Sequence, residues 1–316
     1  MTRTKEIRGF LTKNMVVILL LLMMLFMTVM NRNFLTLSNL TNIFIEMSTY
    51  GTITMAMTIA IICGEFDLSA GATYALCSVF FLKNLDTMGI FPAILVTVLI
   101  GAAVGFVNGF LVARLDIPAF VATLGSMTYV RGIALFYTDG QPVSNANQAI
   151  YQWGNGSFLG IPNLVLTFLL FVAITECFLR FTKSGREIYA VGGSRKIAEL
   201  AGINAKKSKL LIFVILGIAA GIAGVMISCR MASGSAALLG LNTSMSAISA
   251  VVVGGTSLSG GSGSAVRSLI GLLVISVLFN ALTLLGIGAY YQQLIRGLVV
   301  IIIVAIDVYM SLNKKD

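Results

Sequence analysis

The stretch LLIFVILGIAAGIAGVMISC, residues 210–229, indicates the fold class by itself. It carries no charge, and it is as long as the roughly 20 apolar residues that one helix needs to cross a bilayer. Gly217 and Gly221 are four residues apart, and Gly224 follows three residues later. Small residues at this spacing let membrane helices approach closely. The stretch therefore predicts a spanning helix packed tightly against a neighbour.

The rest of the chain has the same character. Of its 316 residues, 58% are apolar and 10% are charged, whereas a soluble domain has about 45–50% and about 25%. We predict an all-α polytopic membrane protein with about ten transmembrane helices, in one transmembrane domain over residues 1–316. The apolar segments are 14–30, 43–63, 71–82, 91–113, 119–137, 164–181, 210–229, 241–253, 268–285 and 294–312. The third and the eighth are short and bordered by glycine, which favours half-helices or re-entrant segments.

The basic residues predict which loops face the cytoplasm. The net charge is +9, and ten spans with an internal N-terminus would place 16 of the 21 basic residues inside. This is the bias of the positive-inside rule. We therefore expect both termini in the cytoplasm, an external loop at 138–162 and a cytoplasmic loop at 182–209. The first segment lacks a small-residue cleavage site, so it is interpreted as an uncleaved span.

The two long loops have distinct features. Tyr151 and Trp153 in the external loop are typical of anchors at a membrane interface. In the cytoplasmic loop, Ser194 is a possible N-cap for a short amphipathic helix with a stripe of small and apolar residues. That stripe comprises Ile197, Ala198, Leu200 and Ala201.

Several kinds of chemistry are excluded or disfavoured. The chain has no histidine, so imidazole bases, His-based triads and most zinc sites are excluded. The cysteines are far apart and lie in or beside apolar stretches, which predicts small buried hydrophobes; they are Cys63, Cys77, Cys177 and Cys229. We predict no metal site, no catalytic residue and no nucleic-acid partner, because the positive charge follows the membrane topology.

Two polar breaks interrupt the apolar sequence: GEFDLSAG at 64–71 and a glycine-rich break at 254–264. Broken helices are tolerated in membranes where they are buried in protein or line a cavity. Asp67 or Ser69 is expected to cap the helix after the first break, and Ser257 or Ser259 the helix after the second. The glycines expected to break the helices are Gly64, Gly71, Gly254, Gly255, Gly260 and Gly261.

The second break is not a phosphate-binding loop, because no lysine lies between Lys209 and Lys314. We therefore expect no cofactor, and ATP would be used by a separate subunit. Polar residues within or beside spans are functional hypotheses. The candidates for a translocation pathway are Asp67, Ser69, Asn108 and Asn280. Arg131, Glu176, Arg296 and Asp307 are expected at interfaces or in packing, and Glu46 is the nearest candidate for proton coupling.

The motifs resemble the permease subunits of bacterial ABC sugar importers, nearest the ribose permease family. The matching stretches follow family order and cover most of the chain from Gly64 onward. They are GEFDLSAGA (64–72), NGFLVARLDIPAFVATLGSMTYVRGIALFYTDG (108–140), GREIYAVGGSRKIAELAGI (185–203), AISAVVVGGTSLSGGSGS (247–264) and LFNALTLLGIGAYYQQLIRGLVVIIIVAID (278–307).

The resemblance implies a transport subunit in the bacterial cytoplasmic membrane. Its implied partners are an ABC ATPase, an extracytoplasmic sugar-binding protein and a second permease subunit, identical or not. The segment 185–203 looks like the cytoplasmic helix that docks on the ATPase. The residues implied in this coupling are Gly185, Arg186, Gly192, Gly193, Ser194, Ala198 and Gly202.

The chain departs from the family pattern at three places. Ser244-Met245-Ser246 stands where Glu-Leu-Asp is common, Arg267-Ser268 replaces a Gly-Thr pair, and Glu65 replaces a frequent glycine. The cargo therefore stays open between a ribose-like sugar, the autoinducer signalling molecule and another small polar solute. A stand-alone ion-coupled carrier and an intramembrane enzyme are alternative classes, but the chain lacks a clear mid-bilayer acid pair and an identifiable nucleophile–base pair.

Overall fold

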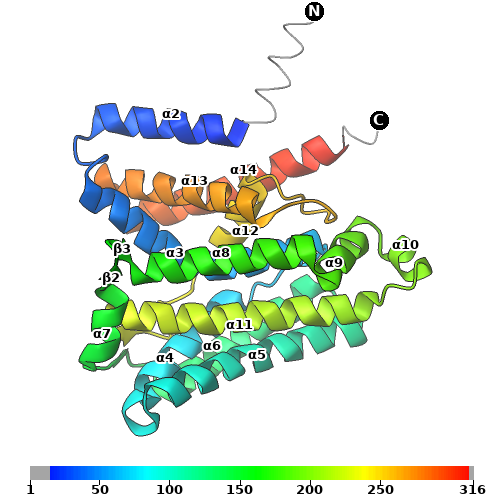
Figure 1. Cartoon of the computed structure of the whole chain (residues 1–316), viewed down its shortest axis with the longest axis horizontal. Helices are drawn as coiled ribbons and strands as arrows, with labels where there is room; N and C mark the ends of the chain where they lie inside the picture. Colours follow the sequence, from blue (N-terminus) through cyan, green and yellow to red (C-terminus); the bar gives the residue numbers. More distant parts are fainter. Residues whose placement is uncertain (1–14, 313–316) are drawn as a thin grey trace, which may run out of the picture.

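The computed structural model describes residues 15–312, without the side chains of residue 15 and of residues 303–304 and 306–312. The described residues do not include the basic residues of the two termini or the side chain of Asp307. The cytoplasmic position of both termini therefore stays a prediction. The long helices run side by side (Figure 1). They are α2 (Met15–Met30), α3 (Leu37–Ile62), α4 (Ala70–Met88), α5 (Ile90–Arg114), α6 (Ala119–Thr138), α8 (Asn163–Phe181), α11 (Ala205–Met231), α13 (Ala265–Leu284) and α14 (Ala289–Leu312).

Most of the labelled short elements lie at the ends of this bundle, whereas α12 lies within it and packs against α3, α13 and α14. Helix α7 with strands β2 and β3 lies at one end, and α9 and α10 lie at the opposite end (Figure 1). The remaining elements are α7 (Gln148–Asn155), α9 (Lys183–Gly193), α10 (Arg195–Leu200), α12 (Thr243–Val253), β1 (Val143–Ser144), β2 (Ser157–Phe158), β3 (Ile161–Pro162) and β4 (Ser233–Gly234). Strand β1 pairs with β4 and β2 with β3, both antiparallel. The two predicted long loops therefore lie at opposite ends of the molecule.

Each predicted apolar segment coincides with a helix. Six of the described helices are long and apolar enough to cross a membrane: α3, α5, α6, α8, α11 and α13. Helix α12 is short, as expected, at 11 residues. The third segment is longer than predicted, because α4 continues to Met88 over 19 residues, but α4 is not among the six helices apolar enough to cross a membrane, so its re-entrant character stays a prediction. Its last turns are polar: Lys83 donates to the Tyr137 carbonyl and Asn84 to the Tyr137 hydroxyl. The count of ten spans stays a prediction.

Helix α11 forms the centre of the bundle, and the predicted glycine spacing explains its packing. A Cβ on Gly217 would lie 2.0 Å from the backbone oxygen of Gly101 on α5, and a Cβ on Gly105 would lie 2.2 Å from that of Phe213. Gly224 faces Cys77 of α4 in the same way. Because no side chain fits between these backbones, the glycines permit the close approach. The tight packing predicted from residues 210–229 is confirmed.

Two smaller predictions are corrected. Cys177 is exposed, whereas the other three cysteines are buried as expected. The helix after the second break, α13, is capped by Ser264, whose hydroxyl accepts the Arg267 N–H at 3.2 Å. Ser257 and Ser259 do not cap it, because Gly260, Gly261 and Gly263 turn the chain with positive φ before the helix begins.

Candidate functional site

The first break holds a buried polar network between α4, α5 and α6. Asp67 Oδ1 accepts the Ser69 N–H at 2.7 Å and the Ser69 hydroxyl at 2.6 Å. Asp67 therefore binds the N–H of Ser69, the residue just before α4, and the Ser69 side chain makes no cap bond to the helix, so the predicted cap by Ser69 is absent. Asn108 Nδ2 on α5 donates to Ser69 Oγ at 2.8 Å, and the Ser126 hydroxyl on α6 donates to Asn108 Oδ1. All four side chains are buried.

The structure thus brings together three of the four candidate pathway residues and separates the fourth. Asn280 on α13 exchanges two amide hydrogen bonds with Asn39 on α3, at 3.0 and 2.9 Å. Ser126 belongs to the network and Ser244 binds the backbone beside it, and neither role was predicted from the sequence. The Ser244 hydroxyl on α12 accepts the Gly71 N–H and donates to the Leu68 carbonyl, both at 2.9 Å. The only sequence signal of Ser126 is a hydroxyl within an apolar segment, whereas Ser244 also stands out as a departure from the family pattern.

Three backbone segments distant in sequence meet where α3 ends: residues 62–64, 192–193 and 260–261. We call this contact the glycine junction. The Gly261 N–H donates to the Ile62 carbonyl at 2.8 Å. A Cβ on Gly192 would lie 1.8 Å from the Ile62 oxygen and 2.7 Å from the Gly261 nitrogen. A Cβ on Gly260 would lie 3.0 Å from the Gly64 nitrogen. The end of α9 is therefore in backbone contact with both polar breaks.

Helices α9 and α10 are well defined by their caps. The Thr182 hydroxyl accepts the Gly185 N–H at 3.0 Å, and the Ser194 hydroxyl accepts the Ile197 N–H at 3.4 Å, so the predicted Ser194 cap is present. Gly185 is needed because a Cβ there would lie 2.3 Å from the Phe178 oxygen. The predicted apolar stripe divides in two. Ala198 packs inward, whereas Ile197 is 68% and Leu200 is 82% exposed.

Asp116, in the turn between α5 and α6, ties α10 and α11 to that turn. Its carboxylate lies 3.3 Å from Arg195 and 3.3 Å from Lys206. Hydrogen bonds from Lys206 and Arg195 hold the pKa of Asp116 below its usual value. Arg195 also pairs with Glu199 at 2.9 Å. Sequence reasoning missed Asp116, because nothing in its local sequence reveals partners that lie 79 and 90 residues further along the chain.

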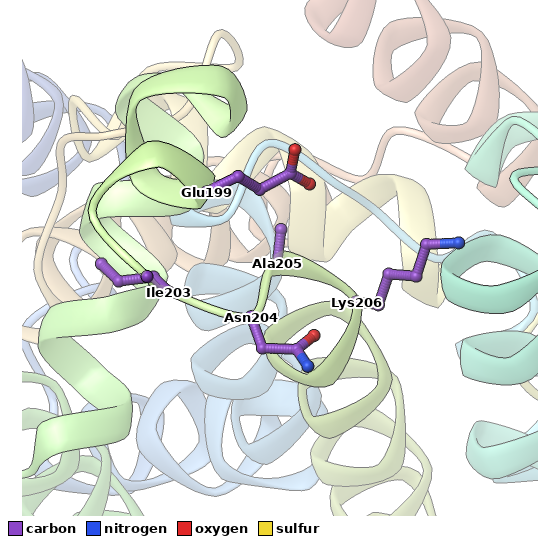
Figure 2. Close-up of a pocket in the computed structure, with 6 residues that line it drawn as sticks. Glu199, Ile203, Asn204, Ala205 and Lys206 are labelled. Carbon is purple, nitrogen blue, oxygen red and sulfur yellow. The ribbon is translucent and has the colours of Figure 1, made fainter.

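A shallow, open pocket of about 390 Å³ lies where α10 leads into α11. In Figure 2 the side chains of Glu199 and Lys206 extend from the two sides of this bend, with Ala205 between them and Asn204 below. The Asn204 side chain accepts the Lys207 N–H at 3.0 Å and caps α11. Lys209, one turn on, pairs with Glu65 of the first break. Ion pairs thus connect α10 and the start of α11 to the α5–α6 turn through Asp116. A further ion pair connects α11 to the first break through Lys209.

The amino-acid sequence matches a known family of transport proteins. The family model described as "Branched-chain amino acid transport system / permease component" matches residues 39–304. The ribose import permease of Haemophilus influenzae is 36% identical over 99% of this chain and 98% of its own length. The chain belongs to this permease family. The permease is also 37% identical to the Bacillus subtilis ribose import permease, over 89% of this chain and 88% of that one.

Other relatives have a different named sugar. The L-arabinose transport system permease of Escherichia coli is 31% identical over 90% of this chain and 86% of its own. No solved structure matches the permease significantly. The sequence-based family assignment is confirmed, and the chain is a multi-pass membrane protein of a transport family rather than a soluble enzyme.

Proposed function

We propose that this permease forms the membrane pathway of an ATP-driven importer for a ribose-like monosaccharide in the bacterial cytoplasmic membrane. The relatives at 35–37% identity named for ribose support the cargo. An ATPase subunit on the cytoplasmic face would supply energy, a binding protein outside would deliver the sugar, and a second permease subunit would complete the pathway.

The observation that carries the coupling assignment is the position of α10 relative to the glycine junction. Ile197 and Leu200 present apolar surface away from the protein. Ala198 fixes the opposite face of α10 against the core, and α9 ends in the glycine junction between the two breaks. Force applied to α10 by an ATPase would therefore reach the backbone at the ends of α3 and α4. In this proposal the glycines of both breaks permit the helices to tilt.

The docking assignment is tested with the double variant Ile197→Asp/Leu200→Asp. Burial of each side chain contributes about 1.5–3 kcal/mol, so the variant is expected to weaken the complex with the ATPase by at least about 100-fold. The readouts are co-purification with the ATPase and ATP hydrolysis in nanodiscs. Leu238→Asp, at a residue that is 74% exposed between β4 and α12, is the matched control. Undiminished co-purification of the double variant would refute docking through α10.

A further inference from the structure

Arg296 on α14 is held against its neighbours without a carboxylate partner. Its guanidinium carbon lies 3.9 Å from the centre of the Phe279 ring on α13. Its Nη1 donates to the Ser246 hydroxyl on α12 at 3.2 Å, and its Nε is buried without a hydrogen-bond partner among the described residues. Two neighbouring helices therefore fix the position of the cation but satisfy only part of its hydrogen-bonding capacity.

The charge of Arg296 is not compensated within the part of the chain that the structure describes. None of the ion pairs there involves Arg296, although Glu46 on α3 acts on it at longer range. Arg131 on α6 provides a contrast. Its two terminal nitrogens donate to the carbonyls of three residues, which explains it as a packing group; these are Ala236, Ala237 and Leu239. A membrane arginine without such partners is expected to serve a function.

A cavity of about 340 Å³ lies beside this guanidinium, between α12 and α14. Ligand pockets in proteins start at about 300 Å³. The lining combines two side-chain amides and a cation with a larger apolar part: Asn242, Met245, Gln293, Arg296, Gly297 and Val300. Amides can donate to and accept from hydroxyls, and a guanidinium pairs with a carboxylate. Gly297 leaves space beside Arg296, because nothing lies within 4 Å of a Cβ built there.

We propose that this cavity is a subsite for a sugar acid, with the carboxylate on Arg296 and the hydroxyls on Asn242 and Gln293. The proposal rests on the proposed function and extends its cargo to ribose-like monosaccharides that carry a carboxylate. A single guanidinium neutralises a single negative charge. A phosphate monoester carries up to two charges at neutral pH, so it would leave excess charge in a lining that holds no other cation.

The test measures binding of radiolabelled D-ribonate to the full-length permease in nanodiscs. Competitors are ribitol, which has the same open carbon chain without the carboxylate, D-ribose 5-phosphate, and acetate, which has the carboxylate without the hydroxyls. We expect D-ribonate to bind at least about tenfold more tightly than any competitor, because a hydrogen bond to a charged group contributes about 1.5–3 kcal/mol. Arg296→Gln is expected to remove this preference, Arg296→Lys to retain part of it, and the control Arg230→Gln to leave it unchanged.

Three outcomes would overturn the proposal. Equal binding of D-ribonate and ribitol would exclude a carboxylate site, and equal competition by acetate would exclude a sugar site. An Arg296→Gln variant that loses dimerisation but keeps the D-ribonate preference would show that a second subunit neutralises Arg296. ATP-driven uptake of D-ribose by the assembled importer is measured in parallel. If that uptake proceeds while the preference is absent, the subsite fails and the proposed function stands.

Discussion

Replacing Gly192 by alanine tests whether α9 is coupled to the core through the glycine junction. The new Cβ would lie 1.8 Å from the Ile62 oxygen, and contacts below 3.0 Å are essentially never observed. The end of α9 must therefore move away from α3 by about 1.2 Å, and overpacking of this kind typically costs about 1–3 kcal/mol. Gly193 is the matched control, because nothing lies within 4 Å of a Cβ at that position.

Two measurements separate stability from coupling in Gly192→Ala. Thermal unfolding is followed with a thiol-reactive dye in a Cys177→Ser background, because the other three cysteines are buried and react only when the protein opens. Cys63 adjoins the junction and is expected to react first. We expect a lower unfolding temperature and at least a tenfold loss of ATP-driven uptake for Gly192→Ala, with Gly193→Ala close to the parent. Equal behaviour of the two variants would refute the junction as the route of coupling.

Three further perturbations have defined outcomes. Gly105→Leu is expected to separate α5 from α11 and abolish folding, whereas Gly125→Leu, which meets open space, should leave thermal unfolding unchanged; equal melting temperatures would contradict this packing. Asn280→Leu removes both amide hydrogen bonds that Asn39 shares with Asn280 and is expected to cost about 0.6–1.7 kcal/mol, measured by the same unfolding assay. An unchanged melting temperature would show that the pair contributes nothing to stability. The pKa of Asp116 is lowered in the folded protein. The stabilisation that its carboxylate gives to the position of α10 is therefore present above the ordinary carboxyl pKa of about 3.9, and it is lost as the pH falls through the lower pKa of the folded state. A spin label on α10 should therefore become mobile only at acidic pH, and Asp116→Asn should make it mobile at neutral pH. Identical spectra of the parent and the variant at neutral pH would show that Asp116 does not hold α10 in place.

The helices of this permease could be predicted from sequence because the membrane restricts what an apolar segment can be. Residues 210–229 predicted both a helix and its packing, since glycines four residues apart in an apolar segment are typical of close helix contacts. The cap at Ser194 was predictable from equally local features. The end of α4 was not, because Lys83 and Asn84 interrupt the apolar pattern and are satisfied by Tyr137, which lies more than fifty residues away.

The arrangement of the sites was less accessible from sequence than the helices. Asp67 and Ser69 stood out as polar residues in a break, but their contact with Asn108 and Ser126 depends on how α5 and α6 pack. Asn280 is an amide within an apolar segment, as Asn108 is, yet it pairs with Asn39 between α13 and α3, away from the polar network. The glycine junction combines the two polar breaks with the segment that resembles the ATPase-docking helix, and nothing in the sequence linked these three segments. Long-range contacts of this kind leave no periodic signal along the chain.

The most direct test of the proposed function is uptake of D-ribose into proteoliposomes that contain the permease, its ATPase and the binding protein. The account predicts uptake that requires ATP hydrolysis, persists without any ion gradient, and falls to background in the Ile197→Asp/Leu200→Asp variant. Uptake by the permease alone, driven by a proton or sodium gradient and unaffected by this variant, would contradict it.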